Sequence, residues 1–316
     1  MPNVKTGRPL SLKPCSNIHE LEVTLARYFL TLKVNERILS IRGLSEDTRM
    51  SIGAVAGAIR KMEETGAVSI EKRGHMGSYL TGVSLGQLWK LLDQGPLVIA
   101  SGLPMHSRFD GLATGLKAAF ESAGIEAYLI FIRGAETRLK ALMDSRCHAV
   151  LMSGLSTQIL NLAEHEIFLM LPPTSWLSGY CVYYREEPVN SARPFRVGVD
   201  NKSYDAKTLT GLEFAGQNVE FIPISYVRIA ESLEKGIIDA IIWNTDQAGY
   251  MVSPEISRRP PSGHVSKITE NKAISAVLVG KKGEDVIRSI LQASIHVDQL
   301  MEIQRLVVEN KMIPEY

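Results

Sequence analysis

The chain has 316 residues, of which 45% are hydrophobic and 22% are charged, and its formal net charge is +1. This length is sufficient for two or three domains, and the composition is that of an ordinary globular protein, which excludes a fibrous or low-complexity protein. The near-neutral balance also excludes binding to nucleic acids or anionic membranes through overall charge alone.

Cysteine usage and the N-terminal residues predict a cellular compartment. Cys15, Cys147 and Cys181 share no metal-ligand spacing, so we expect reduced thiols in a reducing compartment. The first residues, MPNVKTGRPLSLKPCSN, contain no apolar segment of the kind found in a secretory signal, and no stretch of the chain is long and apolar enough for a membrane helix. We therefore expect a cytoplasmic protein that does not bind membranes.

Residues 1–17 carry Lys5, Arg8 and Lys13 among prolines and polar residues. This composition predicts a flexible basic arm. A tail without a role and an arm that contacts DNA both fit it.

Residues 18–82 predict three helices followed by two short strands. Apolar residues recur at helical spacing from Ile18 onward and again over residues 38–44. Ser51 is the expected N-cap of the third helix, and Gly66 is expected just beyond its end. Residues 67–72 alternate apolar and polar side chains, RGHMG forms a turn, and residues 78–81 return. This order is the plan of a winged helix-turn-helix domain, whose third helix enters the major groove of DNA.

The stretch ILSIRGLSEDTRMSIGAVAGAIRKMEETGAVSIEKRGHMGSYL resembles the DNA-binding domain of GntR-type regulators. It keeps that family's order of helices and its pattern A-[IL]-R-[KR]-[ML]-E-E-x-G-x-V, but its wing is longer and the helix start SIGAVAG lacks the arginines that the family directs at DNA. The resemblance implies binding to double-stranded DNA with few base contacts. The residues expected to contact DNA are Arg49, Ser51, Ile52, Arg60, Lys72, Arg73 and His75. A winged helix that contacts only protein is the alternative.

Residues 83–95 predict a linker helix. The sequence VSLGQLWKLLDQGP places leucines and Trp89 on a broad apolar face and ends at Gly95. This face either packs on its own chain or forms a dimer seam. We expect a homodimer, because regulators of this kind commonly pair their heads on palindromic DNA.

Residues 96–316 predict two similar α/β lobes. Apolar runs predict strands at 96–101, 127–132, 149–154, 195–200, 219–224 and 240–245, and amphipathic helices at 109–123, 136–145, 204–215 and 227–235. Near-continuous apolar strands that alternate with helices predict parallel sheets. A strand at 274–282 and helices at 284–295 and 296–311 are expected to return to the first lobe. Lobe one is thus expected at about 96–185 and 272–316, and lobe two at about 186–271.

The two expected crossings between the lobes, LPPTSWLSG (171–179) and SRRPPSGH (257–264), each contain Pro-Pro. This arrangement resembles the type 2 periplasmic-binding-protein fold, and GPLVIASG…ETRLKALMDSRCHAVLMSG resembles the start of LysR-type effector domains. The whole order resembles YhfZ-type transcriptional regulators. It implies an α+β winged helix-turn-helix domain followed by a two-lobed α/β domain of the type 2 periplasmic-binding-protein class.

Ligands of open parallel sheets bind beyond the carboxyl ends of the strands. The candidate ligand-binding residues at these ends are Ser101, Arg108, Arg133, Ser153, Ser156, Thr157, Asp200, Asn201, Tyr204, Trp243, Asn244 and Asp246. The same ends also carry Gly102, Gly134, Thr137, Gly154, Ser203, Ser225, Tyr226 and Thr245. This polar set of mixed charge suits a small metabolite with an anionic group.

The sequence contains no nucleophile elbow, phosphate-binding loop, dinucleotide fingerprint or zinc-protease motif. Its seven histidines show no metal-ligand spacing, and His165 with Glu166 is expected at a helix end. We therefore expect no catalytic residues, no cofactor and no metal. A ligand-responsive transcriptional regulator is the favoured function. The alternatives are a cytoplasmic ligand-binding module whose head contacts protein, and an enzyme on the periplasmic-binding-protein fold.

Overall fold

A computed structural model describes residues 12–185, 193–250 and 255–316. The predicted arm residues Lys5 and Arg8 lie outside the described residues. The chain divides into two compact units. The head unit comprises Met1–Leu97, Ala118–Ala127 and Gly283–Ile295, and the α/β unit comprises Val98–Lys117, Tyr128–Lys282 and His296–Tyr316. Among the helices of the described ranges, none combines the length and the apolar character that a membrane span requires.

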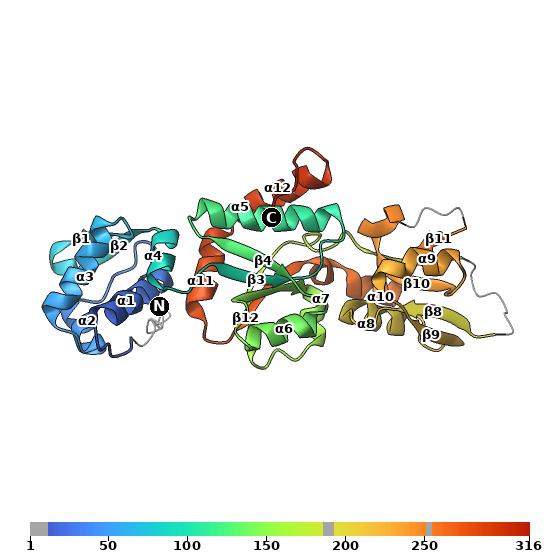
Figure 1. The fold of residues 1–316 in the computed structure, drawn as a ribbon, viewed down its shortest axis with the longest axis horizontal. Coiled ribbons are helices and arrows are strands. Elements are labelled where there is room, and N and C mark those ends of the chain that lie inside the picture. The colour runs from blue at the N-terminus through green and yellow to red at the C-terminus, as the bar shows by residue number, and fades with distance from the viewer. Residues whose placement is uncertain (1–11, 186–192, 251–254) are drawn as a thin grey trace, which may run out of the picture. The chain divides into compact units, whose positions relative to one another are not determined.

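The head unit contains the three predicted helices and the two-stranded wing (Figure 1). Its first elements are α1 Ile18–Thr31, α2 Ile41–Thr48, α3 Ile52–Glu64, β1 Val68–Lys72, η1 Gly74–Met76 and β2 Ser78–Val83. The Ser51 hydroxyl accepts a hydrogen bond from Ala54 N at 3.1 Å and caps α3. Gly66 follows α3 with a φ of 71°, a conformation that favours glycine. The predicted winged helix-turn-helix plan is confirmed.

Two further helices complete the head unit, α4 Leu85–Leu91 and α11 Asp285–Ser294, and both pack on α1. The Leu88 and Trp89 side chains are buried. A Cβ atom on Gly86 would lie 2.3 Å from Gly124 O, so α4 meets another backbone closely there. The predicted linker helix therefore buries its apolar face on its own chain.

The first sheet of the α/β unit defines lobe one. Its strands, in the spatial order β4-β3-β5-β12-β6, are Ala127–Phe131, Leu97–Ser101, Ala149–Ser153, Ala276–Lys281 and His165–Met170. The accompanying helices are α5 Ser107–Ser122, α6 Ala135–Met143, α7 Gly154–Ile159 and α12 Val297–Val308. The late strand β12 lies between β5 and β6, which confirms the predicted return of this strand to lobe one. The helix predicted at 284–295 does not return with it, because it forms α11 of the head unit. Val150, Val277 and Val279 are fully buried in its core.

The second sheet defines lobe two. Its strands, in the spatial order β11-β7-β10-β8-β9, are Ser257–Arg259, Tyr180–Tyr184, Ala240–Asn244, Phe195–Val199 and Val219–Pro223. The helices and helical turns are α8 Tyr204–Glu213, η2 Tyr226–Arg228, α9 Ile229–Glu234, η3 Thr245–Tyr250, α10 Gly263–Thr269 and η4 Asn271–Ile274. Val197, Leu209 and Ile242 are buried in the core between this sheet and α8. The two-lobed α/β fold is therefore confirmed.

Three further details of the prediction are wrong. The sheets are mixed instead of parallel, because β12 runs antiparallel to β5 and β6, and β7 runs antiparallel to β10. Lobe two begins with Tyr180 of β7 and not near residue 186, since β7 pairs within the second sheet. His165 begins strand β6 opposite Lys281 and does not end a helix.

Candidate functional site

A cavity lies between the two lobes of the α/β unit, beyond the carboxyl ends of β3, β4, β5, β8 and β10. Its volume is about 180 Å³. Side chains from both lobes line it, and many of them are aromatic or charged. A concave, partly apolar site with a few polar groups is suited to a small metabolite.

Two polar contacts join lobe one to lobe two at and beside the cavity. Arg133 Nη2 donates hydrogen bonds to both carboxylate oxygens of Asp200 at 2.8 Å, and the guanidinium carbon lies 4.6 Å from the centre of the Tyr226 ring. The Tyr204 hydroxyl donates to Glu136 Oε2 at 3.2 Å. The two lobes therefore contact each other through their own side chains.

A buried carboxylate supplies another contact between the lobes. Asp205 of α8 accepts a hydrogen bond from Ser156 Oγ of lobe one at 2.7 Å and from the Tyr180 hydroxyl at 3.4 Å. Burial raises the pKa of the Asp205 carboxyl above its usual value, although hydrogen bonds from Ser153 and Ser156 oppose this effect. Hydrogen bonds to a buried carboxylate are strong because the surrounding dielectric is low.

Arg138 of α6 is the most deeply buried cation of the cavity lining, with an exposed fraction of 5%. Its Nη1 donates to Ile132 O at 2.9 Å, while its Nε has no hydrogen-bond partner among the described residues. Burial lowers the pKa of the guanidinium to about 10, so the group stays charged at neutral pH. A buried charge with an unpaired donor is costly unless an anion approaches it.

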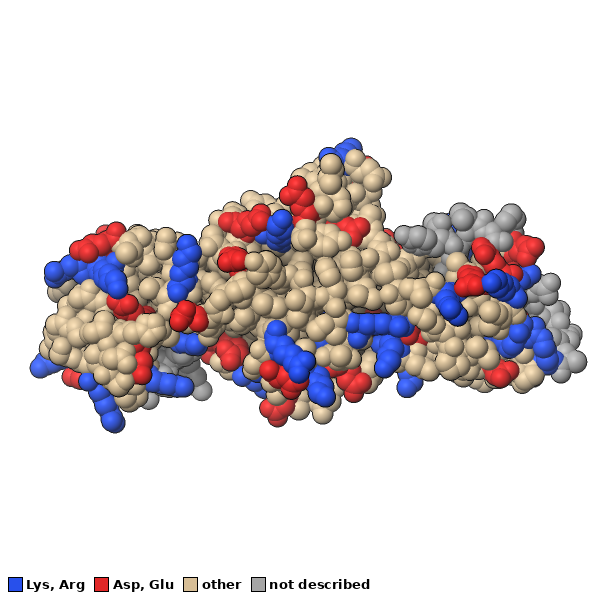
Figure 2. Space-filling view, viewed as in Figure 1, with Lys and Arg blue, Asp and Glu red and all other residues tan. Residues whose placement is uncertain are grey.

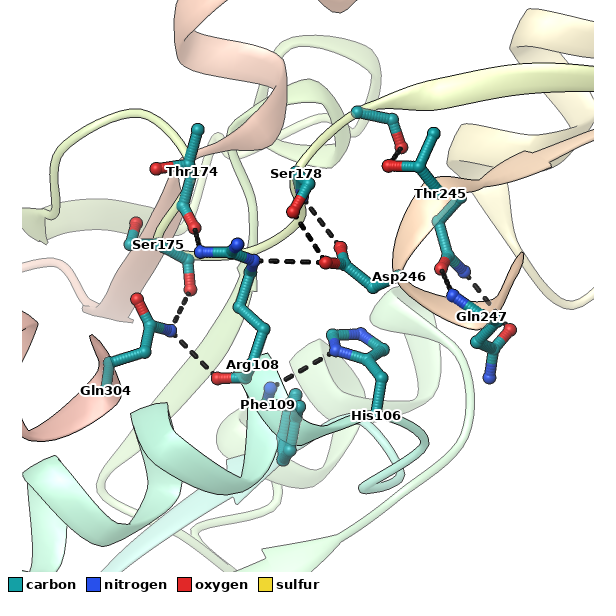
Figure 3. A network of polar contacts seen from close by, with 12 residues as sticks. His106, Arg108, Phe109, Thr174, Ser175, Ser178, Thr245, Asp246, Gln247 and Gln304 are labelled. Atoms are coloured by element: carbon teal, nitrogen blue, oxygen red, sulfur yellow. Dashed lines mark hydrogen bonds and ion pairs between the residues drawn. The ribbon is translucent and has the colours of Figure 1, made fainter. Parts of the chain in front are cut away.

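A hydrogen-bond network joins the lobes beside the cavity (Figure 3). Asp246 accepts from Arg108 Nε at 3.1 Å, from Ser178 N at 2.7 Å and from Ser178 Oγ at 2.6 Å. Burial by itself raises the pKa of Asp246, but the bonds from Ser178 outweigh it and hold that pKa below its usual value. Gln304 of α12 donates to the main-chain oxygens of Arg108 and Ser175 at 2.9 and 2.8 Å. These bonds attach the crossing between β6 and β7 to both lobes.

Seven of the twelve candidate ligand residues line the cavity. They are Arg133, Ser153, Ser156, Asp200, Tyr204, Trp243 and Asn244. Of the other residues at the strand ends, the cavity lining includes Gly102, Gly134, Ser203 and Tyr226. Contact of any of them with a ligand stays a prediction.

The remaining five candidates lie outside the cavity lining. Ser101 is fully buried, and its hydroxyl has no partner among the described residues. The Thr157 hydroxyl donates to the backbone of its own helix, and Asn201 is exposed in a turn. Arg108 and Asp246 belong to the network beside the cavity.

Several lining residues are absent from the sequence-based prediction, among them Phe109, Arg138, Trp176, Tyr180 and Asp205. One signal for Arg138 is present in the sequence. Arg138 shares the helical spacing of Ala135, Leu139 and Leu142, which are buried, so a charged residue occupies an apolar stripe. Such a position indicates a buried polar site.

The exposed face of α3 carries unusually small residues. A Cβ atom on Gly53 or Gly57 would have no atom within 4 Å, and both glycines are exposed. Ile52 has an exposed fraction of 56%, and Arg60 and Arg49 are exposed near the two ends of this face. Each glycine costs a helix about 1 kcal/mol. Packing within the described head does not account for them.

The wing holds one of its predicted cations in place and leaves two exposed. Arg73 forms an ion pair with Glu71 at 2.6 Å and lies 4.4 Å from the centre of the Tyr79 ring. Lys72 and His75 are exposed. Figure 2 shows Lys and Arg side chains projecting from the head at several points, with Asp and Glu between them. The head thus offers local cationic groups and no uniform basic face in this view.

Comparisons with known proteins agree with both halves of the fold. Residues 33–80 match a helix-turn-helix domain, and residues 85–316 match the YhfZ C-terminal domain. The chain is 31% identical over 294 residues to YhfZ of Escherichia coli strain K12, covering 93% of this chain and 95% of that protein. The crystal structure of YhfZ from Shigella flexneri superposes with a TM-score of 0.60 at 26% identity, covering 73% of this chain and 98% of that one. The chain belongs to the YhfZ family.

Proposed function

We propose that this protein is a ligand-responsive transcriptional regulator whose two heads, in a homodimer, bind operator DNA under the control of a small anionic metabolite. One observation carries the proposal: a helix-turn-helix head and a two-lobed domain with a polar cavity belong to one chain. The helix-turn-helix domain favours a regulator over an enzyme.

The face of α3 supports DNA as the partner of the head. Gly53 and Gly57 are one helical turn apart, and nothing in the described head approaches them. Small residues permit a helix to lie close to another surface, and Arg60 adds a cation one turn further on. We propose that this face enters the major groove while Lys72 and His75 contact phosphates beside it.

The contacts between the lobes support control by a ligand. A metabolite in the cavity would touch both lobes, so it would change the balance between a closed and an open cleft. A difference of about 1–3 kcal/mol in affinity for the two states is sufficient for useful coupling to DNA binding.

A selection of sheared genomic DNA on the full-length protein, followed by sequencing, tests the proposal. Gly57→Glu is the informative variant, because glutamate favours helices more than glycine and the site is open. The variant should keep or increase the melting temperature of the head and should lose DNA enrichment through repulsion from phosphates. Gly57→Ala serves as the matched control for the change in helix propensity.

One or a few enriched sites with inverted symmetry, absent with Gly57→Glu, would support a dimeric DNA-binding regulator. Lys72→Ala should lower the slope of log affinity against log salt by about 0.9 if it contacts one phosphate. No enriched site, or the same sites with Gly57→Glu, would reject DNA binding through α3.

A further inference from the structure

We propose that the effector is a small carboxylate whose carboxyl group binds Arg138 in a subsite between Gly102 and Trp176. This proposal rests on the proposed function and names the chemical class of its ligand.

The guanidinium of Arg138 requires an anion. It lines the cavity with an exposed fraction of 5%, and its Nε has no partner among the described residues. The negative charge of Asp205 favours the charged form of Arg138, but only through electrostatic attraction at a distance. Nη1, which lies beside residue 102, and Nη2 form one end of the guanidinium, and such an end matches the two oxygens of a carboxylate.

The shape of the subsite favours a carboxylate with an apolar or planar body. A Cβ atom on residue 102 would lie 3.5 Å from the Trp176 ring and 3.8 Å from Arg138 Nη1. The space beside both side chains is therefore open because residue 102 is glycine. The Trp176 ring, held by an edge contact with Phe109 at 5.7 Å, offers an aromatic surface next to the cation.

The charge of the lining favours one net negative charge on the ligand. Arg133, Arg138 and Lys202 line the cavity together with Asp200 and Asp205, which leaves one positive formal charge in excess. Arg133 is already bonded to Asp200. A monocarboxylate, with or without an additional zwitterionic pair, neutralises this excess, whereas a phosphate dianion exceeds it.

Ligand binding to the full-length protein tests the proposal. The probes are lactate, benzoate, phenylacetate and alanine, each compared with its primary amide, together with inorganic phosphate and sulfate. Thermal shift identifies the compounds that bind, and calorimetry then gives their dissociation constants. At least one carboxylate should bind tenfold or more tightly than its amide, because a charge-assisted bidentate contact is lost in the amide. Comparison of the dissociation constants of alanine and lactate shows whether the site prefers an amino acid or a simple carboxylic acid.

Gly102→Ala tests the location. Residue 102 is not in the left-handed region, and the added methyl would make ordinary contacts, so the fold should be retained. The methyl would fill the subsite and should weaken carboxylate binding tenfold or more. Gly211→Ala is the matched control, because it is exposed in α8 and a Cβ atom there would have nothing within 4 Å. It should leave binding unchanged.

Several outcomes would overturn the proposal: equal binding of acid and amide, binding of phosphate or sulfate alone, unchanged binding in Gly102→Ala, or no binding of any carboxylate tested. The selection on genomic DNA is independent of these results. If the protein binds carboxylates but selects no DNA, the carboxylate subsite is retained and the regulatory function is rejected. If it selects DNA but binds no carboxylate, only the carboxylate proposal is rejected.

Discussion

The ion pair between Arg133 and Asp200 gives a quantitative test of how the lobes are held together. Both carboxylate oxygens of Asp200 accept from Arg133 Nη2 at 2.8 Å, and Asp200 Oδ1 also accepts from Lys202 N at 3.0 Å. Arg133→Gln shortens the side chain and removes its charge. We expect it to weaken the closed arrangement of the cleft.

The size of the effect follows from the burial of the two partners. The Asp200 side chain has an exposed fraction of 5%, whereas that of Arg133 has 36%. Hydrogen bonds to charged groups contribute about 1.5–3 kcal/mol when buried, and exposed ion pairs contribute about 1 kcal/mol or less. Because one partner is buried and the other is partly hydrated, we expect a coupling energy of about 1–2 kcal/mol. This corresponds to roughly a 5–30-fold change in an equilibrium between closed and open forms.

A double-mutant cycle with Arg133→Gln and Asp200→Asn measures this coupling. Urea unfolding is followed by tryptophan fluorescence in the wild-type protein, the two single variants and the double variant, and the interaction energy is the departure from additivity. Arg228→Gln, an exposed arginine of lobe two, is the control and should change stability by less than about 0.5 kcal/mol. A coupling energy below about 0.5 kcal/mol would refute the assignment of this pair as a link between the lobes.

Two further predictions concern the α/β unit. Burial holds the pKa of His106 below its usual value, and its Nδ1 accepts from Phe109 N at 3.2 Å, so the ring is neutral when folded. Below about pH 6.5 the unfolded chain binds a proton that the folded chain does not, so stability should decline as the pH falls from 7 to 5. His106→Asn, which keeps an acceptor, should reduce this decline in melting temperature; an identical pH profile would contradict the role of His106. Glu213, buried in α8, accepts from Arg259 Nη1 and Ser262 N at 2.7 Å each. Glu213→Ala should lower the free energy of unfolding by about 2–4 kcal/mol in urea, and a loss below about 1 kcal/mol would show that water replaces the carboxylate.

The order of elements was largely predictable because buried strands and amphipathic helices have distinct spacings. The apolar runs LVIAS and AVLMS form β3 and β5, and both are central in their sheet. The strand β7, with the sequence YCVYY, was not predicted, because a short aromatic run after a crossing carries no sign of which sheet it joins. Its antiparallel pairing with β10 depends on contacts between residues far apart in the chain. Register and strand direction of this kind are tertiary properties, and local pattern does not determine them.

The lining residues of the cavity were predictable where they follow strands and not where they lie on helices. Strand ends meet at one edge of a sheet, so residues such as Asp200 and Asn244 follow from the order of elements alone. Arg138 instead lies on a helix face whose other members are apolar, and Asp205 lies on a buried face that also carries Thr210 and Glu213. Helical spacing shows only that such charges are buried. It does not show that α6 of lobe one and α8 of lobe two present their charges to the same space, since that depends on how the lobes meet. A charged residue in the apolar stripe of a helix therefore predicts a buried polar site, but it does not predict which group will pair with that charge. For Arg138, the carboxylate binding experiment identifies that group.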